Sequence, residues 1–112
     1  MRNYNGALDN LKKMFQIYET VFGFESEKTA KVLTEIGQIH ELAENIQEAI
    51  DSYKDSFAIW EKIIKDANYE VLLTLAIKIS ELFAITANEA HAYEFLKKVR
   101  NYLFIRFIFL IL

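Results

Sequence analysis

Apolar side chains recur every three or four residues along almost the whole chain, which is the spacing of one face of an α-helix. These stripes predict five helices, over about residues 3–22, 26–44, 46–65, 69–87 and 89–109. Gly23, Asn45 and Asn88 interrupt the pattern between helices. Because the connections are only a few residues long, consecutive helices are expected to run antiparallel. The pattern therefore predicts an all-α fold.

A segment near the start of the chain is repeated 42 residues later: NYNGALDNLKKMFQIYE, residues 3–19, returns as NIQEAIDSYKDSFAIWE, residues 45–61. The same arrangement occurs three times, with an asparagine before a helix and an alanine four positions later, at Asn3 and Ala7, Asn45 and Ala49, and Asn88 and Ala92. Gly37 and Ser80 stand twelve positions before the last two alanines. Small residues at a constant separation predict paired helices that approach closely there, as in a helical repeat.

The residues at the repeat positions match a known motif. Leu33, Ile36, Gly37, His40, Ala49, Tyr53 and Ser56 stand at its characteristic spacing. In this respect the chain resembles the tetratricopeptide repeat family. The resemblance implies a right-handed α-solenoid of antiparallel helix hairpins, with about two and a half repeats and five helices. It implies one domain over residues 1–112, divided into a half repeat 3–22, a repeat 26–65 and a repeat 69–109 with an apolar C-terminal tail.

The 42-residue period is longer than the usual period of about 34 and resembles the kinesin-light-chain subtype. The residues that carry this likeness are Ile17, Tyr18, Glu19, Gly23, Thr29, Ala30 and Leu33. Ser26 and Glu27 depart from it, because the subtype usually has His-Pro in that turn.

Composition removes several kinds of chemistry. The chain has no Cys, so disulfides and thiolate zinc sites are excluded. Its formal net charge of −3 gives no general attraction to nucleic acid. The segment HELAE, residues 40–44, has one His where a zinc-binding helix needs two. We therefore predict a protein that is not an enzyme and has no catalytic, cofactor-binding or metal site.

The resemblance implies that the first helix of each pair lines a concave peptide-binding groove. The candidate groove residues are Lys31, Thr34, Glu35, Gln38 and Glu41 in one repeat and Thr74, Ile77, Lys78 and Glu81 in the next. Reversible peptide binding in this groove is one candidate function. Ordinary solvated helix residues are the alternative interpretation of the same positions.

Both ends of the array are predicted to need covering. The first helix lacks the partner that precedes it in a full repeat, and the tail YLFIRFIFLIL, residues 102–112, is apolar except for Arg106. Repeats bury apolar faces against neighbours. The candidate end-docking residues are Leu8, Leu11 and Phe15 at one end and Phe104, Phe107 and Phe109 at the other. Candidate partners are another protein, more of a longer chain, or a second copy.

These observations favour a non-catalytic scaffold or adaptor, a subunit of a larger assembly. By analogy with the subtype, that assembly is cytoskeletal, ciliary or transport-related, and the location is cytoplasmic. Membrane association through the tail is the less favoured alternative, because only six uncharged residues follow Arg106 and only a dozen residues run from Asn101 onwards, short of the roughly 20 that span a bilayer. The basic residues Lys97, Lys98, Arg100 and Arg106 lie beside that tail.

Overall fold

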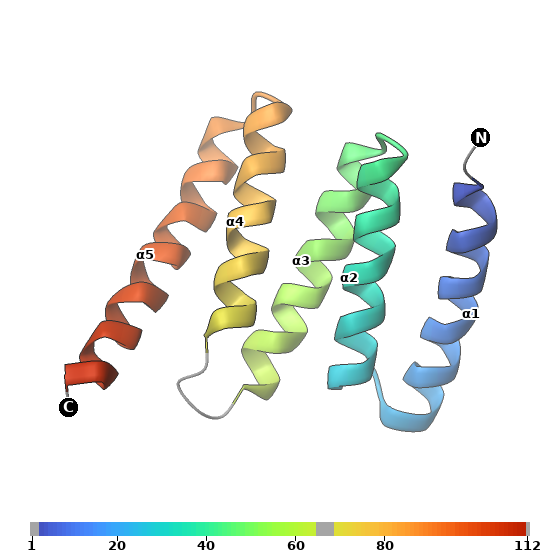
Figure 1. Cartoon of the computed structure of the whole chain (residues 1–112), viewed down its shortest axis with the longest axis horizontal. Coiled ribbons are helices and arrows are strands. Elements are labelled where there is room, and N and C mark those ends of the chain that lie inside the picture. The colour runs from blue at the N-terminus through green and yellow to red at the C-terminus, as the bar shows by residue number, and fades with distance from the viewer. Residues whose placement is uncertain (1–2, 65–68, 112) are drawn as a thin grey trace. The chain divides into compact units, whose positions relative to one another are not determined.

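The computed structural model describes residues 3–64 and 69–111, with the side chain of Phe109 excepted. Within them lie five α-helices and no strand: α1 Tyr4–Phe22, α2 Glu27–Leu42, α3 Ile46–Ile63, α4 Glu70–Ile85 and α5 Glu89–Ile111 (Figure 1). The all-α prediction is confirmed, with helix boundaries within a few residues of those expected. Lys65, the expected end of the third helix, lies outside the described residues.

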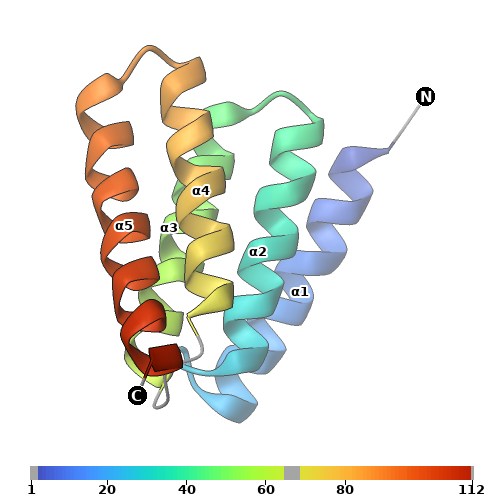
Figure 2. The same cartoon turned by 60° about the vertical axis from the view of Figure 1, so that its left-hand side comes forward.

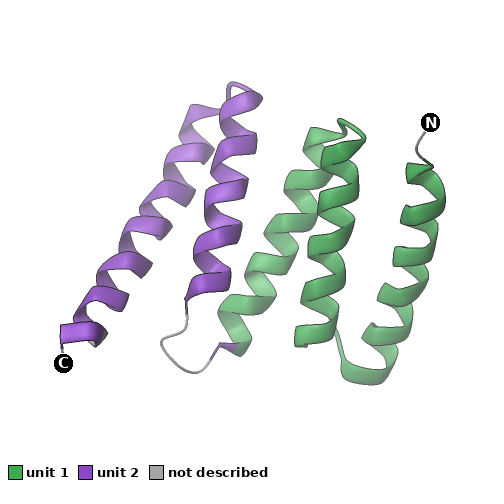
Figure 3. Cartoon of the chain, in the orientation of Figure 1, with its two compact units in different colours: residues 1–63 green, residues 64–112 purple. Residues whose placement is uncertain are grey.

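The chain forms two compact units, Met1–Ile63 and Ile64–Leu112 (Figure 3). In the first unit α2 packs against both α1 and α3, and in the second α4 packs against α5. Figures 1 and 2 show these neighbours side by side from two directions. The first unit thus contains α1 and the α2–α3 hairpin, and the second unit contains the α4–α5 hairpin.

The turn between α1 and α2 depends on a glycine and two hydroxyl groups. Gly23 has φ +87° and ψ 161°, a region that only glycine adopts readily. A glycine directly after a helix favours a left-handed cap; the positive φ is present here, but ψ is extended. The Oγ of Ser26 accepts from the N–H of Thr29 at 3.2 Å, and the buried Thr29 hydroxyl donates to the Gly23 carbonyl at 2.9 Å. This chain of bonds fixes where α2 begins.

The two hairpin turns share one geometry. The N–H of Asn45 donates to the His40 carbonyl, and the N–H of Asn88 donates to the Phe83 carbonyl, both at 2.8 Å. Such bonds across the helix end form a Schellman motif. The left-handed residue is the one before each asparagine, Glu44 at φ 64° and Ala87 at φ 60°. The asparagines were predicted to interrupt the helices. In the structure they stand at the start of the next helix, and the left-handed residue before each of them makes the turn.

Ala87→Gly is expected to raise the free energy of unfolding by about 0.5–1 kcal/mol, because glycine has no Cβ to oppose a positive φ. The matched control is Ala58→Gly in the exposed middle of α3, which should lower it by about 1 kcal/mol. Urea unfolding of the two variants measures both changes. A loss of stability in Ala87→Gly equal to that of Ala58→Gly would contradict the turn geometry.

Two clusters in the core of the first unit join its helices. Leu8, Val32 and Ile36 join α1 to α2, and Ala30, Leu33 and Ile59 join α2 to α3. Phe15 packs against both clusters, and Trp60 packs against the second. In the second unit the rings of Phe83 and Phe95 lie 6.0 Å apart across α4 and α5. Each hairpin is therefore held by apolar contacts at helical spacing.

Gly37 on α2 lies against an aromatic ring of α3. A Cβ built on Gly37 would meet the Tyr53 ring, with Cε1 at 2.7 Å and Cδ1 at 2.8 Å. Ala49, the small residue expected at the contact with Gly37, is fully buried. The absence of a side chain at Gly37 therefore makes room for the Tyr53 ring.

Candidate functional site

Five candidate groove residues lie at helical spacing along one face of α2: Lys31, Thr34, Glu35, Gln38 and Glu41. Lys31, Glu35 and Gln38 are exposed, whereas Thr34 and Glu41 are half-buried. Because positions three and four apart on a helix are neighbours, this set forms one continuous strip of surface. The strip contains two carboxylates and one ammonium group and is therefore acidic.

Thr34 points its hydroxyl towards α3. Its Oγ1 lies 2.8 Å from the Oγ of Ser56, and that Ser56 hydroxyl donates to the Ala30 carbonyl at 2.8 Å. The Thr34 hydroxyl also lies 3.2 Å from the Ala30 carbonyl, so either hydroxyl can donate to the other while its partner donates to that carbonyl. Ser56 is completely buried, so these bonds satisfy polar groups inside the hairpin. The hydroxyl of Thr34 therefore supports packing between the helices.

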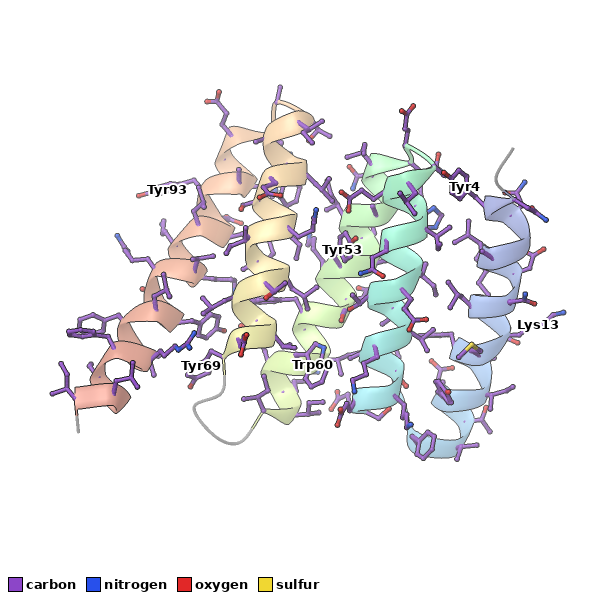
Figure 4. The ribbon with its side chains drawn as sticks, in the orientation of Figure 1. Tyr4, Lys13, Tyr53, Trp60, Tyr69 and Tyr93 are labelled. Atoms are coloured by element: carbon purple, nitrogen blue, oxygen red, sulfur yellow. The ribbon has the colours of Figure 1, made fainter. Side chains whose placement is uncertain are left out.

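Glu41 is held in place from α3. The Tyr53 Oη donates to Glu41 Oε1 at 2.9 Å (Figure 4). Burial raises the pKa of Tyr53 well above its usual range, and the hydrogen bond to Glu41 raises it further. The phenol therefore stays protonated and keeps donating to the carboxylate. This bond fixes the orientation of an acidic group at the end of the strip.

An open pocket of about 410 Å³ lies next to this carboxylate, and Gln38, Glu41 and Leu42 line it. Gln38 offers an amide that can donate and accept, Glu41 offers a fixed negative charge, and Leu42 offers exposed apolar surface. Together they suit a peptide with a free backbone amide and a cationic or apolar side chain.

Lys31 is engaged on its own helix. Its Nζ lies 2.7 Å from Glu27 Oε1, one turn earlier. The hydrogen bond from Lys31 lowers the pKa of Glu27, and the charge of Lys31 lowers it further. Both side chains are largely exposed, so the pair contributes little stability.

The candidate residues of the second unit lie on α4 with the same spacing. Thr74 donates to the Glu70 carbonyl at 3.0 Å, and Lys78 lies 3.9 Å from Glu81. Ile77 is exposed beside them. This strip is thus mixed in character, with one apolar side chain between polar ones.

The apolar end residues on α1 divide into a covered and an uncovered group. Leu8 is only 7% exposed, and half-buried Leu11 and Phe15 pack with it against α2. Four apolar residues of α1 that were not among the predicted end-docking residues are exposed: Met14, Ile17, Val21 and Phe22. Their signal was in the sequence, because the first three recur at helical spacing on a side other than that of Leu8. The uncovered surface of α1 lies on these residues.

At the other end, α5 exposes much of its apolar content. Phe104 is 64% and Phe107 59% exposed, and the side chain of Phe109 lies outside the described residues. Five further residues on this helix extend the exposed apolar surface: Leu96, Leu103, Ile108, Leu110 and Ile111. Two of the three phenylalanines predicted for this end are therefore on the surface.

Comparison with protein families gives a match to a model of the tetratricopeptide repeat over residues 1–62. The chain belongs to the tetratricopeptide repeat family. The match includes α1, α2 and nearly all of α3, which is more than half of the chain. Comparison with curated proteins gives no match, and neither does comparison with solved structures.

Tetratricopeptide repeats generally mediate contacts between proteins, and their fold is a non-catalytic scaffold. In the described part of this chain no group of three or more His, Asp or Glu side chains is arranged to hold a metal ion. None of the helices, over the residues described, combines the length and apolar character needed to cross a membrane. His40, at the aromatic position of the repeat, is half-buried beside Asn45.

Proposed function

We propose that this tetratricopeptide repeat chain is a non-catalytic scaffold or adaptor in a larger assembly. The observation that carries the proposal is the second apolar surface of α1. Its first surface packs against α2, while Ile17 at 58% exposure, together with Val21 and Met14, faces solvent. Repeat helices bury apolar faces on their neighbours. A protein partner, for which a second copy is one candidate, covers this surface.

The assembly is proposed to be cytoskeletal, ciliary or transport-related, with a cytoplasmic location. The 42-residue period and the kinesin-light-chain-like residues around the first turn support this setting. Thr29 is one of those residues, and its hydroxyl stabilises the turn by donating to the Gly23 carbonyl. In this proposal the two units act together as one domain over residues 1–112.

Site-specific photo-cross-linking in cells tests the scaffold proposal. A benzophenone amino acid at Ile17 should form a discrete adduct with a protein whose mass identifies it, and Val21→Glu should abolish the adduct. The same probe at exposed Asp51 on α3 is the control and should give none. A probe at Ile17 that reacts no more than the one at Asp51 would contradict a partner on α1.

Reversible peptide binding on α2 is the second candidate function. The pocket beside Gln38 favours it, because the Tyr53 bond holds the Glu41 carboxylate at its edge. In this case the probe should react at Gln38, and Gln38→Ala should weaken peptide binding without changing the melting temperature. A probe that reacts at Ile17 and not at Gln38 would leave the α1 surface as the binding site.

A further inference from the structure

Helix α5 is longer than the helix it pairs with. α5 has 23 residues and α4 has 16, so α5 is about 10 Å longer. The rings of Tyr69, just before α4, and Tyr102 stack at a centroid distance of 4.8 Å. Residues 103–111 follow that contact and continue beyond the first turn of α4 (Figure 1). We call these nine residues the overhang.

The overhang is apolar on most of its surface. Leu103, Phe104, Phe107, Leu110 and Ile111 are all at least half exposed. They do not form one narrow stripe, because Phe104 and Leu110 lie on different sides of the helix. A helix that is apolar nearly all round needs an apolar environment rather than a single groove.

A basic band precedes the overhang. Lys97 and Arg100 are exposed one to two turns before it, and the Lys97 ammonium lies 4.9 Å from the ring of Tyr93, which points away from α4 (Figure 4). Arg106 within the overhang is also exposed. Glu94, one turn before Lys97, is the last acidic residue of the sequence, and every charged side chain from Lys97 onwards is basic.

We propose that α5 docks the protein onto the surface of an anionic lipid bilayer. The apolar side chains of the overhang enter the acyl region, while Lys97 and Arg100 lie among the headgroups and Arg106 reaches them with its long side chain. Nine helical residues reach about 13 Å, close to half of the roughly 30 Å hydrocarbon core, so the overhang enters one leaflet. Basic residues near the surface gain from anionic lipid, and exposed apolar residues gain from leaving water.

Charge also disfavours a second copy paired in parallel at this end. If two α5 helices paired in parallel through their exposed residues, Lys97, Arg100 and Arg106 of one would lie near the same charges of the other, and like charges repel. The bilayer proposal goes beyond the scaffold function, which rests on α1 and not on α5. The two are therefore tested separately.

Vesicle flotation of the full chain tests the proposal. The chain should float with phosphatidylcholine vesicles containing 30% phosphatidylserine, bind pure phosphatidylcholine at least tenfold more weakly, and dissociate as NaCl rises. Aggregated protein sediments and is thus separated from bound protein. Lys97→Glu with Arg100→Glu should lower the partition coefficient roughly 25-fold or more, because each basic residue contributes about fivefold.

Matched controls lie on α1. Lys12→Glu with Lys13→Glu makes the same charge change at exposed positions, and Lys13 points away from α2 (Figure 4). Phe104→Ser with Phe107→Ser should weaken binding to the anionic vesicles, whereas Ile17→Ser with Val21→Ser should not. Circular dichroism confirms that each variant keeps its helices.

Three outcomes would overturn the proposal: no flotation with anionic vesicles, equal binding to both lipid mixtures, or equal losses in the α1 and α5 pairs. A photo-cross-link from Phe104 to an acidic protein in cells, without vesicle binding, would assign the overhang to a protein partner instead. None of these results changes the expected adduct at Ile17, so failure here is distinct from failure of the scaffold function.

Discussion

Ile59→Ala is expected to lower the free energy of unfolding by about 2–5 kcal/mol. Ile59 is 1% exposed and lies in the cluster with Ala30 and Leu33 that joins α2 to α3. Truncation removes buried methyl groups and leaves a cavity, because fully buried Ala30 is too small to fill the space. Urea unfolding followed by circular dichroism measures the loss.

Ile17→Ala is the matched control for this prediction. The same atoms are removed from a residue that is 58% exposed on α1, so the change should stay within about 0.5–1 kcal/mol when no partner is bound. Similar losses in the two variants would mean that the α2–α3 contact around Ile59 does not form in solution.

The burial of Ile59 also shows that apolar periodicity does not predict every buried residue of a helix. Apolar residues three and four positions apart in the third helix form a stripe through Ile50, Phe57 and Trp60 that leaves out Ile59, yet Ile59 is more deeply buried than Trp60. In α4, Leu73 and Leu82 are likewise buried, although they lie beside the stripe formed by Leu72, Leu75, Ala76, Ile79 and Phe83. A single stripe describes a helix with one covered side. Where a helix is buried over a wider arc, its buried residues can be predicted only if the positions of all its neighbours are known. A single sequence does not give those positions.

The sequence predicted where the turns lie, but it did not predict their backbone conformation. Asn45 and Asn88 correctly marked the start of the next helix, but the left-handed residues before them are Glu44 and Ala87. Neither type favours a positive φ, because each has a Cβ. Packing of the hairpin imposes the turn and overrides this local preference. The sequence marked Gly23 as the glycine that ends the first helix, but it did not predict the extended ψ of 161°.

For the candidate site, too, the sequence predicted the positions of residues but not their hydrogen bonds. Helical spacing was enough to set Lys31, Glu35 and Gln38 on one exposed strip of α2. It could not reveal that Thr34 bonds to Ser56, or that Glu41 accepts from Tyr53, since those partners are distant in sequence. Hydrogen bonds between helices depend on how the helices are rotated against each other, and that rotation follows from packing.

Gly37→Ala is expected to lower the free energy of unfolding by about 1–3 kcal/mol. The new Cβ would lie 2.7 Å from Cε1 of Tyr53, closer than van der Waals contact permits. The ring has little freedom to move away, because it is buried and its hydroxyl is bonded to Glu41. Helix propensity alone predicts the opposite sign, since alanine is favoured over glycine by about 1 kcal/mol inside a helix. The sign of the measured change therefore decides between local preference and the α2–α3 contact.

A double-mutant cycle with Tyr53→Leu isolates that contact. If the ring causes the loss, Gly37→Ala should be less destabilising in the Tyr53→Leu background, with a coupling energy above about 0.5 kcal/mol. The neighbouring change Gln38→Ala, at an exposed position of the same helix, should stay within about 0.5 kcal/mol in both backgrounds. A stabilising Gly37→Ala, or no coupling to Tyr53, would mean that the hairpin does not bring Gly37 against this ring. The same packing places the Tyr53 hydroxyl beside Glu41. Without it, nothing from α3 would hold the Glu41 carboxylate at the end of the α2 strip.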